Sequence, residues 1–202
     1  MSRSQIAMGH YKTNVTSEPF SNKHIRKILN EYIRLATVNN NYKTISACDP
    51  FARNSFTNNT DGFITNDLND MMPTNFNLEF AEFALMMAEL GKEFDLVLFD
   101  PPYSLRQLKD CYDNIGFQLE QWQTQKPWSR GKDILAPLVK PGGYVISFGW
   151  HSHGFGTHRG FAKKAVYVFE SMGREERYDT IMTIERKVQT TLDSLFVETE
   201  EE

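Results

Sequence analysis

The sequence predicts an α/β protein with a doubly wound, mostly parallel sheet and an antiparallel β-hairpin at its C-terminal end. Three observations predict this fold class. Short apolar runs bounded by turns alternate with amphipathic segments along most of the chain. The run FDLVLF at 94–99 is almost continuously apolar, as in a strand covered on both faces. Two further apolar runs, at 164–169 and 180–185, are joined by a polar segment with one glycine, which indicates a hairpin and an antiparallel edge strand.

The composition is that of one folded domain. The 202 residues are 40% hydrophobic and 24% charged, which is enough to bury a core and excludes a disordered or fibrous chain. With 22 Lys and Arg against 26 Asp and Glu, the net charge of −4 excludes a uniformly basic surface, so any nucleic-acid contact needs a local patch. No run approaches the roughly 20 apolar residues of a membrane span, and two cysteines are too few for a disulfide framework. We therefore expect a soluble, cytoplasmic protein without membrane association.

The first half of the chain divides into an arm and several elements. Residues 1–20 are polar and aperiodic, and we expect a flexible N-terminal arm there. The folded domain begins at Ser21, where apolar residues recur every three or four positions and predict an amphipathic helix that ends at the asparagine run 39–41. Short apolar runs then predict two strands, and a second segment with helical spacing predicts a helix. These elements cover 44–48, 62–65 and 78–90.

The second half continues the alternation to the end of the domain, which we place at 21–187. A mixed polar and aromatic stretch at 105–139 predicts one or two helices. The sequence Lys-Pro-Gly-Gly at 140–143 predicts a tight turn into a strand at 144–148. After the hairpin, residues 188–202 form an acidic tail that we expect to be solvated and mobile.

The sequence Asp100-Pro101-Pro102-Tyr103 directly follows the predicted strand 94–99. Ligands of doubly wound sheets bind beyond the carboxyl ends of the strands. Two prolines fix φ and remove two N–H donors, so the Asp100 carboxylate and the Pro101 carbonyl stay available as acceptors. Tyr103 offers a stacking plane for a flat ring. Two acceptors on the N–H bonds of an exocyclic amine free its lone pair for attack, so this corner suits such an amine. An ordinary strand-ending loop is the alternative.

With these residues the chain resembles the S-adenosylmethionine-dependent amino-methyltransferases that carry a DPPY motif, and in particular the phage-type adenine-specific (N6) DNA methyltransferases. The resemblance runs from 45 to 187 through ISACDPFARNS, FDLVLFDPPYS, LVKPGGYVISFGW and YDTIMTIERK. It implies a Rossmann-like methyltransferase sheet, S-adenosyl-L-methionine as cofactor, and Asp100, Pro101, Pro102 and Tyr103 as the catalytic residues. It also implies cofactor-binding residues: Asp49, Pro50, Phe51 and Ala52 in a DPFxGxG-like loop, Asp67 at the ribose, and Glu79 at the adenine.

The chain departs from the family pattern after Ala52. Arg53, Asn54 and Ser55 stand where the family has glycines, which let the backbone approach the methionine part of the cofactor. Only residues 53–61 separate this loop from the next predicted strand, fewer than a helical crossover takes. We therefore expect the first crossover helix to be truncated or absent. Either Arg53 pairs with the carboxylate of the cofactor, or the cofactor pocket is lost.

Basic residues beyond the motif are the candidates for nucleic-acid contacts. We expect phosphate contacts from Arg106, Lys109, Arg130, Lys132 and Arg159. Solvated helix faces are the alternative interpretation. The chain has little room for a target-recognition domain, which favours low sequence selectivity, a homodimer or a separate specificity partner. Three histidines at 151–158 have no carboxylate or thiolate beside them, and we expect no metal site.

The resemblance favours one function and leaves three others open. The first is transfer of a methyl group to the N6 amine of adenine in DNA, with the base flipped into the DPPY pocket, in the cytoplasm of a bacterium or a phage-infected host. Methylation of guanine N2 in RNA and of cytosine N4 in DNA rest on the same chemistry. The last alternative is a phage protein that kept the methyltransferase fold for binding or structure and lost catalysis.

Overall fold

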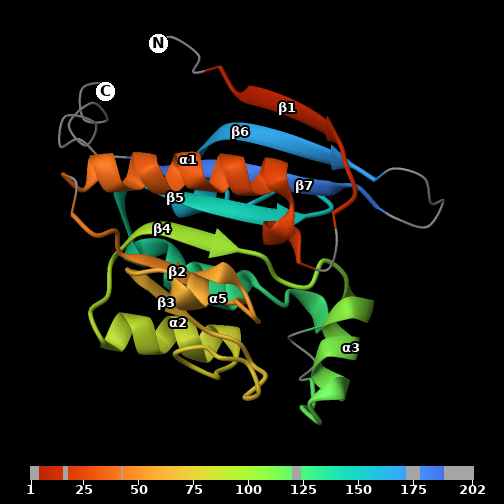
Figure 1. Cartoon of the computed structure of the whole chain (residues 1–202). Helices are drawn as coiled ribbons and strands as arrows, with labels where there is room; N and C mark the ends of the chain where they lie inside the picture. Colours follow the sequence, from red (N-terminus) through yellow and green to blue (C-terminus); the bar gives the residue numbers. More distant parts are fainter. Residues whose placement is uncertain (1–4, 16–17, 42, 120–123, 172–177, 189–202) are drawn as a thin grey trace, which may run out of the picture.

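The computed structural model describes residues 5–15, 18–41, 43–119, 124–171 and 178–188. These residues form one seven-stranded sheet in the order β1-β6-β7-β5-β4-β2-β3. Helices cover both of its faces (Figure 1). The predicted α/β fold class, a doubly wound and mostly parallel sheet with an antiparallel hairpin near the C-terminus, is confirmed.

The centre of the sheet is parallel. It consists of β2 (Ala47–Asp49), β3 (Phe63–Thr65), β4 (Phe94–Phe99) and β5 (Val139–Gly149). Every residue of β4 is buried, because both of its faces are covered by helices. All four strands lie where the apolar runs predicted them, and β5 also takes in the predicted turn residues 140–143.

The C-terminal hairpin consists of β6 (Phe161–Glu170) and β7 (Thr180–Lys187), which pair antiparallel. The expectation that the hairpin supplies an edge strand is wrong. β7 lies between β5 and β6 and is antiparallel to both, so its backbone is paired on both sides. The four residues 182–185 are all buried, as expected of an inner strand with both faces covered.

One edge of the sheet is β1 (Ala7–Lys12), which pairs parallel with β6, and the other edge is β3. We expected an aperiodic arm over 1–20, and this is wrong for the six residues of β1. The strand is half exposed and contains Gly9, against which the Tyr167 ring packs so closely that a Cβ would lie 2.5 Å from it. Such an edge strand carries little apolar signal. The predicted acidic tail lies outside the described residues, except for Val188.

Helices cover the sheet from two sides. α1 (Lys23–Asn39) packs on one face, and fully buried Ile25 and Leu29 each contribute about 2 kcal/mol of hydrophobic stabilisation there. The Asn22 side chain caps its N-terminus by accepting from the His24 and Ile25 N–H groups. α2 (Phe80–Glu89) and α5 (Ser129–Leu135) pack on the opposite face.

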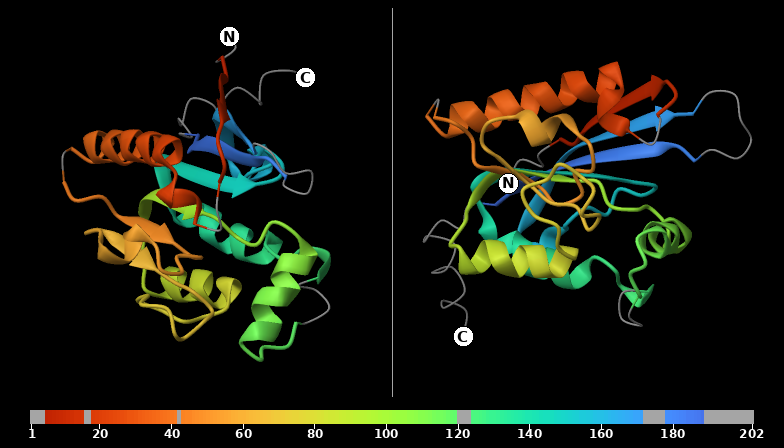
Figure 2. Two further views of the ribbon diagram at one scale, coloured as in Figure 1. Left: turned by 45° about the vertical axis from the view of Figure 1, so that its right-hand side comes forward. Right: turned by 60° about the horizontal axis from the view of Figure 1, so that its bottom comes forward.

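The helix α3 (Leu105–Asn114) follows β4 in the chain. It lies beyond the carboxyl ends of the strands rather than on a sheet face (Figures 1 and 2). The crossover from β2 to β3 contains only a short 3₁₀ helix, Phe56–Asn59, which confirms that the first crossover helix is absent. Within the described ranges, no helix has the length and apolar character needed to cross a membrane.

Candidate functional site

A cavity of 910 Å³ lies at the carboxyl ends of β2, β3 and β4. Its walls come from the loops after these three strands, from α3, and from the start of the chain near Pro19. This volume falls in the range of sites that enclose a small organic ligand. The loops after β2 and β3 line one half, and the aromatic residues Tyr103, Trp150 and Tyr178 line the other. The DPPY corner lies between the two halves.

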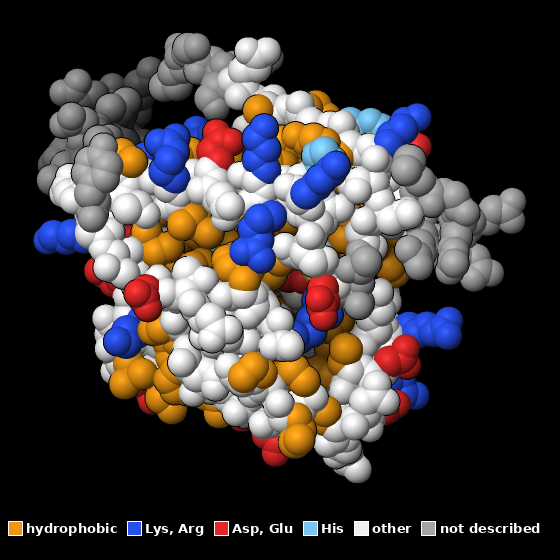
Figure 3. Space-filling model, viewed as in Figure 1, with side chains coloured by type: hydrophobic (Ala, Val, Ile, Leu, Met, Phe, Trp, Pro, Cys, Tyr) orange, Lys and Arg blue, Asp and Glu red, His pale blue; other side chains and the backbone are white. Residues whose placement is uncertain are grey.

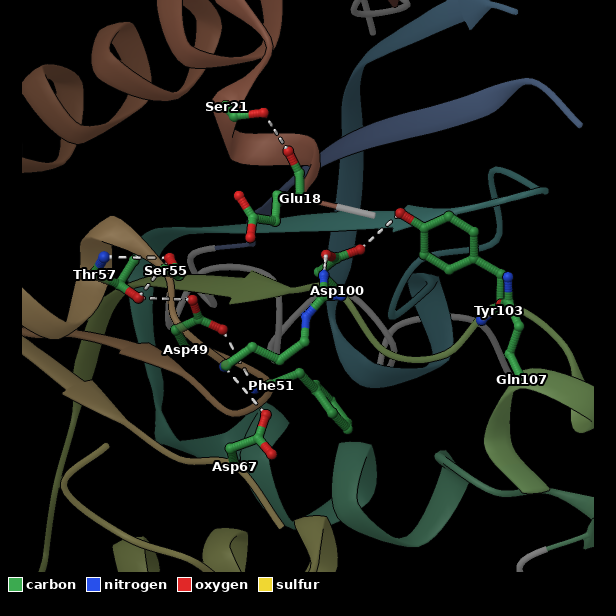
Figure 4. Close-up of polar contacts among 11 residues, drawn as sticks. Glu18, Ser21, Asp49, Phe51, Ser55, Thr57, Asp67, Asp100, Tyr103 and Gln107 are labelled. Atoms are coloured by element: carbon green, nitrogen blue, oxygen red, sulfur yellow. Dashed lines mark hydrogen bonds and ion pairs between the residues drawn. The ribbon is translucent and has the colours of Figure 1, made fainter. Parts of the chain in front are cut away.

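Asp100 ends β4 and is the acidic group of this corner. Its side chain is 3% exposed. Oδ1 accepts a hydrogen bond from the Tyr103 hydroxyl at 2.7 Å, and Oδ2 accepts one from Arg53 Nη2 at 3.3 Å (Figure 4). Burial raises the pKa of the Asp100 carboxyl, while Arg53 and the Tyr103 hydrogen bond oppose that rise. We expected Asp100 to be a free acceptor, and the structure shows both of its oxygens bonded.

Tyr103 is held by the start of α3. Its backbone N–H donates to Gln107 Oε1 at 2.7 Å, while the Ser104 hydroxyl caps the helix by accepting from the Gln107 N–H. The Tyr103 ring contacts Trp150 edge-on, with centroids 6.2 Å apart, and Trp150 packs on Tyr178 at 4.2 Å. Pro101 and Pro102 also line the cavity. This half therefore offers aromatic planes beside a carboxylate, as the motif predicted.

Asp49 lies at the end of β2 but does not line the cavity. It is fully buried, and its carboxylate accepts from the Thr57 hydroxyl at 2.9 Å and from the Phe51 N–H at 3.3 Å. Burial raises its pKa to about 7. Ala52 is also buried, and its N–H donates to the carbonyl of Asn66. Contrary to the expected cofactor contacts, Asp49 and Ala52 hold the loop in place, whereas Pro50 and Phe51 reach the cavity.

Asp67, after β3, does line the cavity. Its Oδ1 accepts from the Asn69 N–H at 2.9 Å and its Oδ2 from the Arg53 N–H at 3.1 Å. Partial burial raises its pKa. A carboxylate has about four acceptor positions, so Asp67 retains capacity for hydroxyl donors in the cavity.

Glu79 is not part of the cavity wall. Its side chain caps α2 by accepting from the Ala81 N–H at 2.6 Å, and it also bonds the Tyr112 hydroxyl, which contributes to raising the pKa of Tyr112. Its neighbours Leu78 and Phe80 line the cavity instead. The adenine contact expected of Glu79 stays a prediction, and the cavity wall at this point is apolar.

Three aromatic rings form a wall in the half that Asp67 lines. Phe51 contacts both Phe80 and Trp128, each with centroids 5.1 Å apart. Trp128 lies between basic residues in the sequence, and the fold brings it to this wall. Spacing along the chain gives no sign of the contact, because the three residues come from separate elements.

Comparisons with known proteins support this architecture. No protein-family profile matches the sequence, and no curated protein matches it. Among solved structures, N-methyltransferase NodS from Bradyrhizobium japonicum WM9 superposes with a TM-score of 0.51 and 10% identity, over 84% of this chain and 99% of NodS. Its complex with S-adenosyl-l-homocysteine gives 0.51 and 11%, over 86% and 94%. The chain has a Rossmann-like methyltransferase fold. At these identities, the likeness to NodS is one of fold alone.

Within the methyltransferase fold, Arg53 lies between the two halves of the cavity, which we call half-sites: its backbone N–H is bonded to Asp67 and its side chain to Asp100. Its φ of +48° is a left-handed conformation that costs about 1–2 kcal/mol for a residue with a Cβ. The conformation is one that glycine adopts freely, which agrees with the glycine of the family pattern. The carbonyl of Arg53 accepts from Asn58 Nδ2 at 2.7 Å. The backbone therefore follows a glycine path, while the side chain adds a cation.

Two of the basic residues predicted to contact nucleic acid are hydrogen-bonded to other parts of this methyltransferase fold. Lys132 Nζ donates to the Gly154 carbonyl at 2.9 Å, lies over the Phe99 ring, and has its pKa lowered to about 8, mainly by burial. The Arg159 guanidinium bonds Asp133 at 2.7 Å and the Phe155 carbonyl at 2.9 Å, with a side chain that is 11% exposed. Both side chains join loops to α5, which leaves them less available for the phosphate contacts expected of them; those contacts stay a prediction.

The other candidates lie on the surface. Arg106 and Lys109 are exposed on α3, and Arg130 is exposed on α5. The structure adds a basic group that was not assigned a role: Lys and Arg side chains gather over α1 (Figure 3), among them exposed Lys23 and Lys27. The described ranges contain no group of three or more His, Cys, Asp or Glu suited to a metal ion.

Proposed function

We propose that the chain transfers a methyl group from S-adenosylmethionine to the exocyclic N6 amine of adenine in DNA. The observation that carries the proposal is the position of Asp100-Pro101-Pro102-Tyr103 on the wall of the same cavity that Asp67 lines. A single cavity can thus bring an amine held at the corner close to a cofactor held beside β3. The shared fold with an N-methyltransferase agrees with this function.

The half lined by Asp67 fits the cofactor by its chemistry. The Asp67 carboxylate suits ribose hydroxyls, and the aromatic wall of Phe51, Phe80 and Trp128 suits an adenine ring. The Arg53 guanidinium suits a carboxylate. When bound there, S-adenosylmethionine supplies an electrophilic methyl group on a sulfonium sulfur.

The other half fits the base. The Pro101 carbonyl and the Asp100 carboxylate are acceptors for the two N–H bonds of an exocyclic amine, and they hold its lone pair in one direction. Tyr103 and Trp150 provide planes for a flipped base, worth about 1–3 kcal/mol of stacking. The raised pKa of Asp100 makes its carboxylate a better acceptor for the proton that the amine loses.

A second candidate function is supported by one specific contact. The Arg53–Asp100 ion pair neutralises the catalytic acid and occupies space between the half-sites. Such an arrangement also fits a binding or structural protein that kept the fold without transfer. Absence of S-adenosylmethionine binding at millimolar concentration in calorimetry would favour this second candidate.

Methyl-labelled S-adenosylmethionine tests the proposal directly. The protein is incubated with the labelled compound and parallel pools of DNA and RNA, and modified nucleosides are identified by mass spectrometry. We expect label on adenine N6 in DNA, and loss of that label in Asp100→Asn. Label confined to guanine in RNA or to cytosine in DNA would replace the substrate. Label in neither pool would overturn transfer to these substrates, and if S-adenosylmethionine binding is also absent, the second candidate is left.

A further inference from the structure

Arg53 is bonded to both acids of the cavity. Its backbone N–H donates to Asp67 Oδ2 at 3.1 Å, and its guanidinium donates to Asp100 Oδ2 at 3.3 Å. In the proposed function, Asp67 serves the cofactor and Asp100 serves the target amine. One residue therefore contacts both half-sites.

The contact with Asp100 blocks the acceptor that the target amine requires. One carboxylate oxygen is bonded to Arg53, the other to Tyr103, and only 3% of the side chain is exposed. An amine entering the corner in this state would meet a neutralised carboxylate beside a cation. Since a cation repels an amine that becomes positively charged on methylation, this arrangement opposes transfer as well as binding.

The Arg53 side chain has the means to leave Asp100. It is 47% exposed within a cavity of 910 Å³, so packing does not fix it in one place. The contact is made by one guanidinium nitrogen at 3.3 Å, whereas a guanidinium binds an accessible carboxylate best through two parallel hydrogen bonds. A free carboxylate ligand in the cavity would therefore compete well for it.

We propose, on the basis of the proposed function, that Arg53 is a positioning residue that makes target binding depend on the cofactor. Without a ligand, Arg53 covers Asp100. When the cavity holds S-adenosylmethionine, Arg53 turns to its carboxylate and leaves Asp100 open to the target amine. The cofactor then binds before the base, and the residue that departs from the family's glycine pattern sets this order.

Two ligands that differ in the amino-acid group, and so in the carboxylate, test the first half of the inference. S-adenosylhomocysteine carries an amino-acid carboxylate, and 5′-methylthioadenosine has the same adenosine and thioether without it. Calorimetry compares the wild type with Arg53→Met, and with Arg34→Ala as a control, because Arg34 is an exposed arginine on α1. We expect Arg53→Met to weaken S-adenosylhomocysteine about tenfold to a hundredfold and to leave methylthioadenosine unchanged. The control should change neither.

The second half is tested by binding of a fluorescent, adenine-containing single-stranded oligonucleotide. In the wild type, saturating S-adenosylhomocysteine should tighten oligonucleotide binding about tenfold. In Arg53→Met the affinity should be the same with and without S-adenosylhomocysteine, because nothing covers Asp100. Arg53→Gly is the second variant: glycine adopts the φ of +48° without strain, so the fold is retained, and it should behave as Arg53→Met does.

The outcomes separate the inference from the proposed function. If the wild type binds neither adenosine ligand, the proposed function fails and the inference fails with it. If the wild type binds S-adenosylhomocysteine and both Arg53 variants bind it equally well, only the inference is overturned. An oligonucleotide affinity in the wild type that does not respond to S-adenosylhomocysteine also overturns the inference and leaves the proposed function standing.

Discussion

The loops after β2 and β4 carry the same Asp-Pro dipeptide, but the two aspartates have different hydrogen-bond partners. β2 and β4 are neighbouring parallel strands with an Asp-Pro dipeptide at the carboxyl end of each: Asp49, before Pro50, is the last residue of β2, and Asp100, before Pro101, directly follows β4. Asp49 is bonded to a backbone N–H and a threonine hydroxyl of its own loop. Asp100 is bonded to two long side chains, Arg53 and Tyr103, that line the cavity.

The two carboxylates differ in whether a ligand could replace their partners. Asp49 has local partners that cannot leave without unfolding the loop, so its role is to fix the loop between β2 and β3. Asp100 has partners that can swing away within the cavity, so a ligand can replace them. The dipeptide is the same in both cases and both side chains are buried, so neither feature distinguishes the two aspartates.

The largest expected difference between the two corners is in methyl transfer. Asp100→Asn should lower the rate of transfer about a hundredfold to a thousandfold, because it removes the charged acceptor for the target amine. Binding of S-adenosylhomocysteine should not weaken, since the amide frees Arg53. Single-turnover assays and calorimetry measure the two quantities. A variant with wild-type transfer would remove the role given to Asp100.

For the free energy of unfolding we expect the opposite order, with a larger loss from replacing Asp49 than from replacing Asp100. Asp49→Ala leaves the buried Phe51 N–H and Thr57 hydroxyl without their acceptor and should lower the free energy of unfolding by about 2–3 kcal/mol. Asp100→Asn should cost less than about 1 kcal/mol, because the exposed Arg53 guanidinium can turn to water and the amide oxygen can still accept from the Tyr103 hydroxyl. Urea denaturation measures both. Equal losses would mean that the two carboxylates are equally structural.

The rate of methyl transfer should distinguish the role of the Tyr103 ring from that of its hydroxyl. Tyr103→Ala removes the stacking plane and should lower transfer about tenfold more than Tyr103→Phe, which removes only the hydroxyl bonded to Asp100. Steady-state kinetics with a DNA substrate provides the comparison. Equal losses in the two variants would assign the effect to the hydroxyl instead.

The pH dependence of stability should report mainly on Asp49. Its pKa is about 7 in the folded protein and near the ordinary 3.8 when unfolded, so the folded state binds the extra proton between these values. The free energy of unfolding should therefore fall as the pH rises from about 4 to about 7, and then level off. Denaturation at pH 5 and pH 8 should show this fall in the wild type and a smaller one in Asp49→Asn. An equal fall in both would assign it to other groups.

The smallest effect concerns a single hydroxyl in the loop after β2. Thr57→Val removes the donor to Asp49 and should cost about 1 kcal/mol of stability, with a further rise in the Asp49 pKa. Thr60→Val is the matched control, because its hydroxyl bonds the Phe56 carbonyl in the same loop. NMR titration of the Asp49 carboxyl should show a shift for Thr57→Val alone. A shift of the same size in both variants would argue against the Thr57 contact.

The sequence predicted most of the fold because most elements carry a local apolar period. The strands from β2 to β7 and the helices α1, α2 and α3 follow from such runs. β1 carries too few apolar residues to be seen, and its partner β6 lies more than 150 residues along the chain from it. The place of β7 inside the sheet also depends on pairing between distant strands, which no local pattern encodes.

The sequence predicted the motif at Asp100–Tyr103, but it did not predict which side chains bond to one another at the site. Asp100 and Tyr103 could be identified from the sequence because they belong to one four-residue motif directly after a buried strand. The Arg53–Asp100 bond joins residues 47 positions apart, so nothing in the local sequence shows it. Lys132 and Arg159 were assigned by charge, and charge alone does not tell a surface cation from one bonded to carbonyls beneath the surface. Tertiary packing decides these cases.

The central claim is that this cavity methylates adenine N6 in DNA. The most direct measurement is mass spectrometry of DNA from cells that lack other adenine methyltransferases and express either the wild type or Asp100→Asn. We expect N6-methyladenine in DNA from the wild-type cells and none in DNA from the variant cells. Wild-type DNA without N6-methyladenine, or the same amount with both proteins, would contradict it.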